Sequence, residues 1–325
     1  MRKIIFILKV GREFGVSYGH FYRSLSIAQN KQLRSYEKIF VTNKNLLIKK
    51  LLFKKNIRNI QIKNFNLTNI KKTVKKKFAN IVFVDLPKEY MSIYSKLKFK
   101  NQVLLSDSEK KRKNYDFLIN YSILLKENKN NNEFLGLKYF FKKSNSRIRL
   151  KNRIKNIFVS FGGSDFHNYG LQIAKFIHDL DLNEFKFTIN FGPGFIKKKF
   201  HEIKDKFKRK NIEFFYDNRD YDKYLLNSDL VITGGGITAY KIANSLKPLL
   251  IIPGSKHENK IANKMHQTKS AILLKASNNR LDKKYFKLIL NNINKKYYFR
   301  KMLMCQKKLF SPNKFNLAIK MIKNF

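Results

Sequence analysis

The chain has 325 residues, of which 43% are hydrophobic and 14% aromatic, and its formal net charge is +48. This length exceeds the usual span of one hydrophobic core and predicts two domains. The apolar content excludes a disordered protein. Taken alone, the charge would indicate a nucleic acid, an anionic membrane surface or an acidic substrate as the partner.

The basic residues are spread along the whole sequence and do not form one local patch. The densest runs, at residues 71–77, 110–113 and 197–199, lie in separate segments and lack interleaved aromatic residues and any zinc or recognition-helix motif. We therefore interpret most of the charge as a solvated surface. Peripheral contact with an anionic membrane is the second interpretation, and no specific nucleic-acid partner is expected. The sequence does not indicate an oligomeric state.

The cysteine content and the N-terminus favour a reducing, cytoplasmic compartment. Cys305 is the only cysteine, so neither an internal disulfide nor a thiolate metal cluster is expected. The apolar run at residues 4–8 is soon interrupted by Lys9 and Arg12, which predicts a buried strand and not a signal peptide. The histidines show no metal-ligand spacing and no Ser/His/Asp order stands out, so no metal, cofactor or covalent nucleophile is predicted.

Short apolar runs alternate with helix-like segments, which is typical of parallel strands joined by helical crossovers. In the first half, a helix is expected at residues 22–31, and strands are expected at residues 4–8, 38–41, 81–84, 103–105 and 117–119. Apolar periodicity is lost over residues 142–155, and we place a domain boundary there.

The second half repeats this pattern. Strands are expected at residues 157–161, 185–191, 212–216, 230–233 and 249–252, and helices at residues 169–180, 221–226 and 238–245. The spacing of Phe315, Ala318, Ile319 and Ile322 predicts a last helix that packs back on the first domain. The sequence therefore predicts an α/β fold of two Rossmann-like domains, residues 1–150 and 151–305, with mostly parallel sheets facing across a cleft, followed by a C-terminal helix at 306–325.

Ligands of open α/β sheets bind beyond the carboxyl ends of the strands, so the glycine-bearing turns after strands are candidate sites. The first such turn spans residues 15–23. Gly19 lets the backbone approach a ligand, and the following helix start offers unpaired N–H groups to an anion. His20 would then point into the cleft; the alternative is a helix-start residue that makes only local hydrogen bonds.

The second turn spans residues 160–165. Gly162 and Gly163 free the backbone to wrap a phosphate, and Ser164 or Asp165 can cap the helix that follows Asn168. A tight turn with an ordinary helix cap explains this pattern equally well.

The third turn contains Gly234, Gly235 and Gly236, between an apolar strand and a helix that starts at Ile237 and Thr238. It can hold a diphosphate against the N–H groups of the helix start. The absence of a Walker lysine argues against a P-loop, and the absence of a dinucleotide fingerprint after the first strand argues against a simple dehydrogenase.

A loop at residues 253–259 follows the next strand. Its polar residues, among them His257 and Glu258, can contact a sugar; a plain solvated loop is the alternative.

At these turns the sequence resembles the GT-B-fold enzymes that comprise MurG-type glycosyltransferases and, more closely, the UDP-sugar hydrolase of pseudaminic acid biosynthesis with its spore-coat polysaccharide relatives. The resemblance runs through most of the chain. The segments that carry it are Gly19-His20 with Arg23, residues 115–120, residues 136–139, residues 161–165 with Asn168, and residues 227–229 leading into the third turn and residues 238–240.

The resemblance implies that the C-terminal domain holds UDP and that the N-terminal domain supplies a catalytic histidine, which maps onto His20. Arg23 separates the hydrolase-like pattern from MurG-type enzymes. The implied nucleotide-sugar contacts are Gly19, Arg23, Tyr139, Gly162, Gly163, Ser164, Asp165, Asn168, Gly234, Gly235, Gly236, Ile237, Thr238, Lys241, His257 and Glu258.

The sequence departs from the family pattern in four motifs. Ser17 stands where a glycine is common, and Asp85 keeps the acidic residue of an Asp-His-Tyr motif without its companions. Lys241 replaces a glutamate that binds the nucleotide ribose, and Glu258 replaces a glutamine. A lysine cannot accept hydrogen bonds from ribose hydroxyls, but it can contact a phosphate.

The leading functional hypothesis is hydrolysis of the sugar–phosphate bond of a UDP-activated amino-sugar, with His20 activating or orienting water. The alternative is a transferase that moves the sugar to a lipid or glycan acceptor. A binding or scaffold protein whose site is eroded at Lys241 is a third hypothesis, and a nucleic-acid binder is the fourth.

Overall fold

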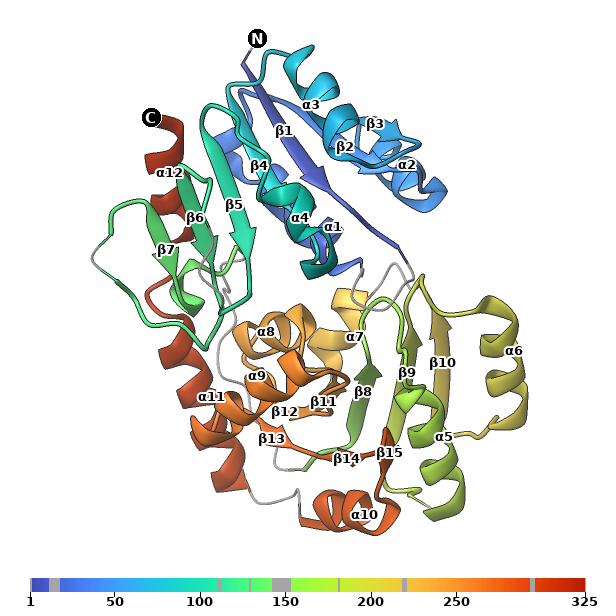
Figure 1. Cartoon of the computed structure of the whole chain (residues 1–325). Helices are drawn as coiled ribbons and strands as arrows, with labels where there is room; N and C mark the ends of the chain where they lie inside the picture. The colour runs from blue at the N-terminus through green and yellow to red at the C-terminus, as the bar shows by residue number, and fades with distance from the viewer. Residues whose placement is uncertain are drawn as a thin grey trace. The chain divides into compact units, whose positions relative to one another are not determined.

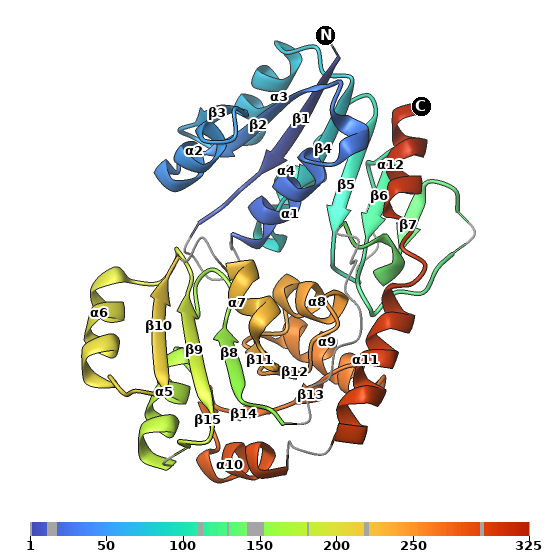
Figure 2. The same ribbon diagram turned by 180° about the vertical axis from the view of Figure 1, so that it is seen from behind.

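A computed structural model describes residues 2–11, 18–109, 113–128, 130–141, 153–180, 182–217, 221–292 and 296–324 (Figures 1 and 2). The chain forms two compact units. Unit 1 comprises Met1–Lys143 with Pro312–Phe325, and unit 2 comprises Ser144–Ser311. Each unit contains a large sheet in which neighbouring strands pair in parallel, which confirms the predicted α/β class.

The sheet of unit 1 has seven strands in the order β3-β2-β1-β4-β5-β6-β7. These strands are β1 (Lys3–Leu8), β2 (Glu37–Asn43), β3 (Arg58–Ile62), β4 (Ile81–Asp85), β5 (Gln102–Ser106), β6 (Phe117–Asn120) and β7 (Glu133–Leu135). The helices are α1 (Gly19–Ala28), α2 (Leu46–Phe53), α3 (Leu67–Lys75), α4 (Met91–Tyr94) and α12 (Phe315–Asn324), with 3-10 turns η1 (Lys31–Leu33), η2 (Lys88–Tyr90) and η3 (Leu137–Tyr139).

Helices cover both faces of this sheet. Ile4, Phe6 and Leu8 of β1 belong to a core that includes α1, α2 and α12, while Ile5 and Ile7 belong to a second core that includes α3 and α4. A central parallel strand that is buried on both faces needs apolar residues at every position, which explains the unbroken run in β1. Figures 1 and 2 show α12, in red, beside the sheet of unit 1.

The sheet of unit 2 has the order β10-β9-β8-β11-β12-β13. Its strands are β8 (Asn156–Ser160), β9 (Lys186–Phe191), β10 (Ile212–Tyr216), β11 (Leu230–Thr233), β12 (Leu249–Ile251) and β13 (Ile272–Leu273), and a separate hairpin pairs β14 (Ala276–Ser277) with β15 (Arg280–Leu281). The helices are α5 (Tyr169–Leu180), α6 (Lys197–Lys206), α7 (Tyr221–Asn227), α8 (Ile237–Asn244), α9 (Lys256–Gln267), α10 (Lys283–Asn292) and α11 (Lys296–Phe310).

The first predicted helix is shifted. The sequence predicted residues 22–31, whereas α1 begins at Gly19 and ends at Ala28. The Asn30 side chain accepts a hydrogen bond from Gln32 N at 2.9 Å and starts the separate turn η1, which ends α1 early. His20 therefore lies inside the first turn of the helix. Residues 142–152 of the predicted boundary, and Ser17 of the first glycine turn, lie outside the described residues.

Besides the short α4, two longer helices of unit 1, α2 and α3, were not predicted. Each begins after an asparagine whose side chain caps the first turn: Asn45 accepts from Ile48 N at 3.1 Å, and Asn66 accepts from Asn69 N at 2.9 Å. None of the described helices is both long and apolar enough to cross a membrane.

Candidate functional site

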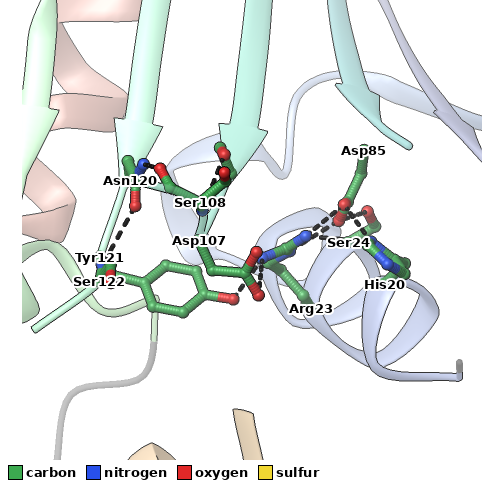
Figure 3. A network of polar contacts seen from close by, with 10 residues as sticks. His20, Arg23, Ser24, Asp85, Asp107, Ser108, Asn120, Tyr121 and Ser122 are labelled. Atoms are coloured by element: carbon green, nitrogen blue, oxygen red, sulfur yellow. Dashed lines mark hydrogen bonds and ion pairs between the residues drawn. The ribbon is translucent and has the colours of Figure 1, made fainter. Parts of the chain in front are cut away.

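A buried polar network lies where β4, β5 and β6 of unit 1 end (Figure 3). The first turn of α1 places His20 there, and Asp85 is the last residue of β4. His20 Nδ1 lies 2.6 Å from Asp85 Oδ1. This position is the carboxyl edge of a parallel sheet, where open α/β folds bind their ligands.

Arg23 holds Asp85 from the same helix, one turn after His20. Its Nε donates to Asp85 Oδ2 at 2.7 Å, and its Nη2 donates to Asp85 Oδ1. The remaining amino group donates to the hydroxyl of Tyr121, just beyond β6. Ser24 adds a hydroxyl donor at 3.2 Å from Asp85 Oδ2. Both charged side chains are buried, with 2% of Arg23 and 1% of Asp85 exposed.

The charges of this network keep Asp85 ionised. Burial alone would raise its pKa, but Arg23 and His20 lower the pKa of Asp85 to about 2. An ionised carboxylate only accepts hydrogen bonds, so a neutral His20 carries its proton on Nδ1. Its Nε2 then has a free lone pair. Such a nitrogen can take a proton from water or from a hydroxyl group.

The lowered pKa of Asp85 predicts a pH-dependent stability term. Its pKa falls from the ordinary 3.8 to about 2, so the native state favours the ionised form. The stabilisation is complete above about pH 4 and is lost as the pH falls towards 2, and it amounts to about 2 kcal/mol. In urea unfolding from pH 2 to 6, the free energy of unfolding of wild type should exceed that of Asp85→Asn, and this difference should shrink below pH 4. A constant difference would contradict this pKa.

The structure surrounds Arg23 with protein partners. It was expected to contact the nucleotide sugar, but it is 2% exposed and its donors bind Asp85 and Tyr121. Its role in the structure is to hold Asp85, and through it His20. Sequence reasoning missed Tyr121 and Asp107 entirely, because they join the network only through the pairing of β4, β5 and β6.

In unit 2, the second glycine turn is tightly packed. Gly162 has φ +70°, and Gly163 O accepts from Gly194 N at 2.7 Å. A Cβ on Gly192 would lie 2.2 Å from Gly162 O, so the turn after β9 requires a glycine there. A Cβ on Gly162 would lie 3.4 Å from Thr238 Oγ1. The second and third turns therefore lie side by side.

Asp165 caps α5, as predicted. Its two oxygens accept from Tyr169 N and Gly170 N, both at 2.8 Å. Burial raises the pKa of Asp165 to about 6, against the lowering effect of these hydrogen bonds. Asn168 Oδ1 accepts from Lys199 Nζ at 2.8 Å. The Ser164 hydroxyl is buried and has no hydrogen-bond partner among the described residues.

Glu258 binds the third glycine turn from within the protein. Its Oε2 accepts from Gly254 N at 2.8 Å and from Gly235 N at 3.3 Å. Burial raises the pKa of Glu258. We expected Gly235 to offer its N–H to a diphosphate and Glu258 to contact a sugar; in the structure these two groups bind each other. Ile237 and Thr238, in the first turn of α8, remain as candidate anion donors.

The contact between Glu258 and this turn predicts opposite outcomes for neighbouring glycines. A Cβ on Gly235 would lie 2.6 Å from Glu258 O, whereas the nearest atom to a Cβ on Gly234 is Glu258 Oε2, at 3.5 Å. Gly235→Ala should therefore lower the free energy of unfolding by about 1–3 kcal/mol. Gly234→Ala, the matched control, should change it by no more than about 0.5 kcal/mol. Chemical denaturation measures both, and equal values would contradict the described packing.

The other predicted contacts have different surroundings. Lys241 Nζ pairs with Asp222 Oδ1 at 2.5 Å and lies 4.4 Å from the centre of the Tyr221 ring. Tyr139 packs its ring against Phe134, with 5.4 Å between the ring centres. His257 Nε2 is buried without a hydrogen-bond partner in the described part of the chain.

The structure thus brings His20 together with Arg23 in unit 1, and Gly162 together with Thr238 in unit 2. Within the described ranges, no group of three or more His, Cys, Asp or Glu side chains is placed to hold a metal ion.

Comparison with known proteins shows which fold this is. No protein-family model matches the sequence, and no curated protein matches it. Among solved structures, MurG of Acinetobacter baumannii aligns with a TM-score of 0.67 at 11% identity, over 99% of this chain and 100% of that one. The spinosyn rhamnosyltransferase SpnG, solved with thymidine diphosphate, aligns with a TM-score of 0.67 at 10% identity, over 100% and 99%.

Anabaena HepE, solved in complex with UDP, aligns with a TM-score of 0.59 at 10% identity, over 99% of this chain and 100% of that chain. At such low identity these alignments report the fold alone. Because they cover both units from end to end, the chain has the GT-B fold of glycosyltransferases.

Proposed function

We propose that this protein is an enzyme that cleaves the sugar–phosphate bond of a UDP-activated amino-sugar and releases UDP, as in the hydrolase family that its sequence resembles. The observation that carries the proposal is the 2.6 Å contact between His20 Nδ1 and Asp85 Oδ1 at the carboxyl edge of the unit 1 sheet. A histidine held in this way by an ionised carboxylate is equipped as a general base.

In the proposed reaction, His20 Nε2 takes a proton from water as the water oxygen bonds to the anomeric carbon. The bond between that carbon and the phosphate oxygen breaks, and UDP leaves with the electron pair. Asp85 stabilises the imidazolium that forms, and Arg23 keeps Asp85 ionised and in place.

Unit 2 is proposed to bind the nucleotide. The first turn of α8, at Ile237 and Thr238, lies beside the Gly162 turn, and unpaired N–H groups at a helix start favour phosphate oxygens. The buried Ser164 hydroxyl, which lacks a partner among the described residues, is a further donor in this turn. Lys241 lies in the same helix, where the resembled family has a glutamate, and its ammonium group pairs with Asp222.

Sugar transfer to a lipid or glycan hydroxyl is the second candidate. Its support is that MurG and SpnG, which share the fold, are glycosyltransferases. The same His20 nitrogen would then deprotonate the acceptor hydroxyl in place of water. Neither the base nor the phosphate-binding turns distinguish the two reactions.

The test is to incubate the purified protein with a panel of UDP-hexoses and UDP-amino-sugars and to measure UDP release with and without added acceptors. Release without an acceptor supports hydrolysis. Release that requires a lipid or glycan acceptor selects transfer. No release and no sugar transfer under any condition would contradict an enzymatic role.

A further inference from the structure

Asp107 is the solvent-facing carboxylate of the polar network in unit 1. It directly follows β5, which is the neighbour of β4 in the sheet, so it leaves the sheet at the same edge as Asp85. Its side chain is 40% exposed, whereas that of Asp85 is 1% exposed. Figure 3 shows Asp107 beside Arg23 and Tyr121. It did not figure among the residues predicted from the sequence.

The contact between Asp107 and Arg23 is loose. Asp107 Oδ2 lies 3.7 Å from Arg23 Nη1, which is beyond hydrogen-bond distance. Arg23 directs its donors elsewhere, with Nε and Nη2 bound to Asp85 and Nη1 bound to the Tyr121 hydroxyl. Among the described residues, Arg23 is the only ion-pair partner that Asp107 has. Its carboxylate oxygens therefore keep acceptor capacity for a ligand.

Within this network, the negative charge of Asp107 is the one that Arg23 does not compensate. The ionised Asp85 and the guanidinium of Arg23 compensate each other, and the Nδ1-protonated tautomer of His20 is neutral. Asp107 thus supplies a negative charge beside the candidate base, in a chain with 70 Lys and Arg but only 22 Asp and Glu. A carboxylate in this setting attracts groups that donate hydrogen bonds or carry positive charge.

We infer that Asp107 binds the sugar of the substrate, by accepting hydrogen bonds from a hydroxyl or ammonium group while the anomeric carbon reacts at His20. This inference rests on the proposed function. His20 Nδ1 and Asp107 Oδ2 lie 3.1 Å and 3.7 Å from amino groups of the same guanidinium. Both side chains therefore flank one guanidinium, and in this arrangement one sugar unit contacts Asp107 while its anomeric carbon lies near His20.

The test compares Asp107→Asn with Glu127→Gln in the full chain. Glu127 is a matched control because it lies in unit 1, is 41% exposed and pairs with Lys138 and Lys314, away from the His20 network. Asp107→Asn should raise KM for the UDP-sugar by about 10- to 100-fold, because the uncharged amide is a weaker acceptor than the carboxylate and hydrogen bonds to charged groups lie in this range, with kcat changed less than about 3-fold. Glu127→Gln should change neither constant.

Titration calorimetry gives a readout that does not need turnover. In wild type, the UDP-sugar should bind more tightly than UDP. Asp107→Asn should reduce this difference while leaving the Kd for UDP unchanged, because an amide oxygen is a weaker acceptor than a carboxylate. If Asp107→Asn weakens the binding of a UDP-sugar with a free amino group more than that of its N-acetylated or hydroxyl counterpart, the group bound by Asp107 is the ammonium. Equal weakening identifies a hydroxyl group.

Unchanged KM and unchanged UDP-sugar affinity in Asp107→Asn would overturn the inference. So would a parallel loss of affinity for UDP, because UDP lacks the sugar that is attached to the diphosphate in the substrate. Failure of the proposed function looks different, since wild type itself would then release no UDP from any UDP-sugar and transfer no sugar. Comparison of melting temperatures identifies a variant that has failed to fold, and Asp107→Ser then replaces it.

Discussion

Replacing His20 with asparagine is expected to lower kcat for UDP release by about 10²- to 10⁴-fold, the range for loss of a general base. Asparagine can still donate a hydrogen bond to Asp85 from its amide, so the 2.6 Å contact has a substitute donor. It has no basic nitrogen to replace Nε2. The loss should therefore fall on the chemical step.

The His20 variant is best measured beside His178→Asn, because His178 lies in α5 and its side chain is 49% exposed. His20→Asn should keep the Kd for UDP within about 3-fold of wild type, since a contact used only in the transition state does not change ground-state binding. His178→Asn should behave like wild type in both assays. UDP release at an equal rate by His20→Asn would remove this residue from the mechanism.

Replacing Arg23 with methionine should cost about 3–5 kcal/mol of unfolding free energy, the range for breaking a buried ion pair by removing one partner. The variant leaves Asp85, which is 1% exposed, without the cation that keeps it ionised. Its pKa should then rise, because burial alone raises it. Urea denaturation at neutral pH measures the loss.

Two further variants make this stability prediction specific. Arg58→Met breaks an exposed pair with Glu37 at 3.5 Å and should cost no more than about 1 kcal/mol. Combining Arg23→Met with Asp85→Asn should recover part of the lost stability, because the second change removes the unpaired charge. If Arg23→Met costs no more than Arg58→Met, the network does not stabilise unit 1 in the way its geometry indicates.

The sequence predicted the parallel sheets because their central strands carry a strong signal. β11 is buried throughout and β1 is buried from Ile4 to Leu8, so their apolar runs stand out against Lys- and Asn-rich surroundings. The helices α2 and α3 lack such contrast, since lysines interrupt their apolar faces and the asparagines that cap them are common everywhere in this chain. Short edge strands such as β7 and β13 gave no periodic pattern.

The site was predictable only where its signal is local. His20 could be chosen as a candidate because a glycine precedes it after a strand, and the cap by Asp165 follows from its position before a helix. The pairing of His20 with Asp85 joins residues 65 positions apart and depends on β1 and β4 lying side by side. The contact of Glu258 with Gly235 likewise depends on the first turn of α9 packing against the turn after β11.

The most direct test of the central claim, that this chain binds a nucleotide-activated sugar, is calorimetric titration with UDP and a UDP-amino-sugar at moderate salt. We expect saturable binding at one site for both. Inorganic pyrophosphate, titrated in parallel, should bind at least about 10-fold more weakly, which separates nucleotide recognition from attraction to a net charge of +48. No binding of either UDP compound, or binding no tighter than that of pyrophosphate, would contradict the claim.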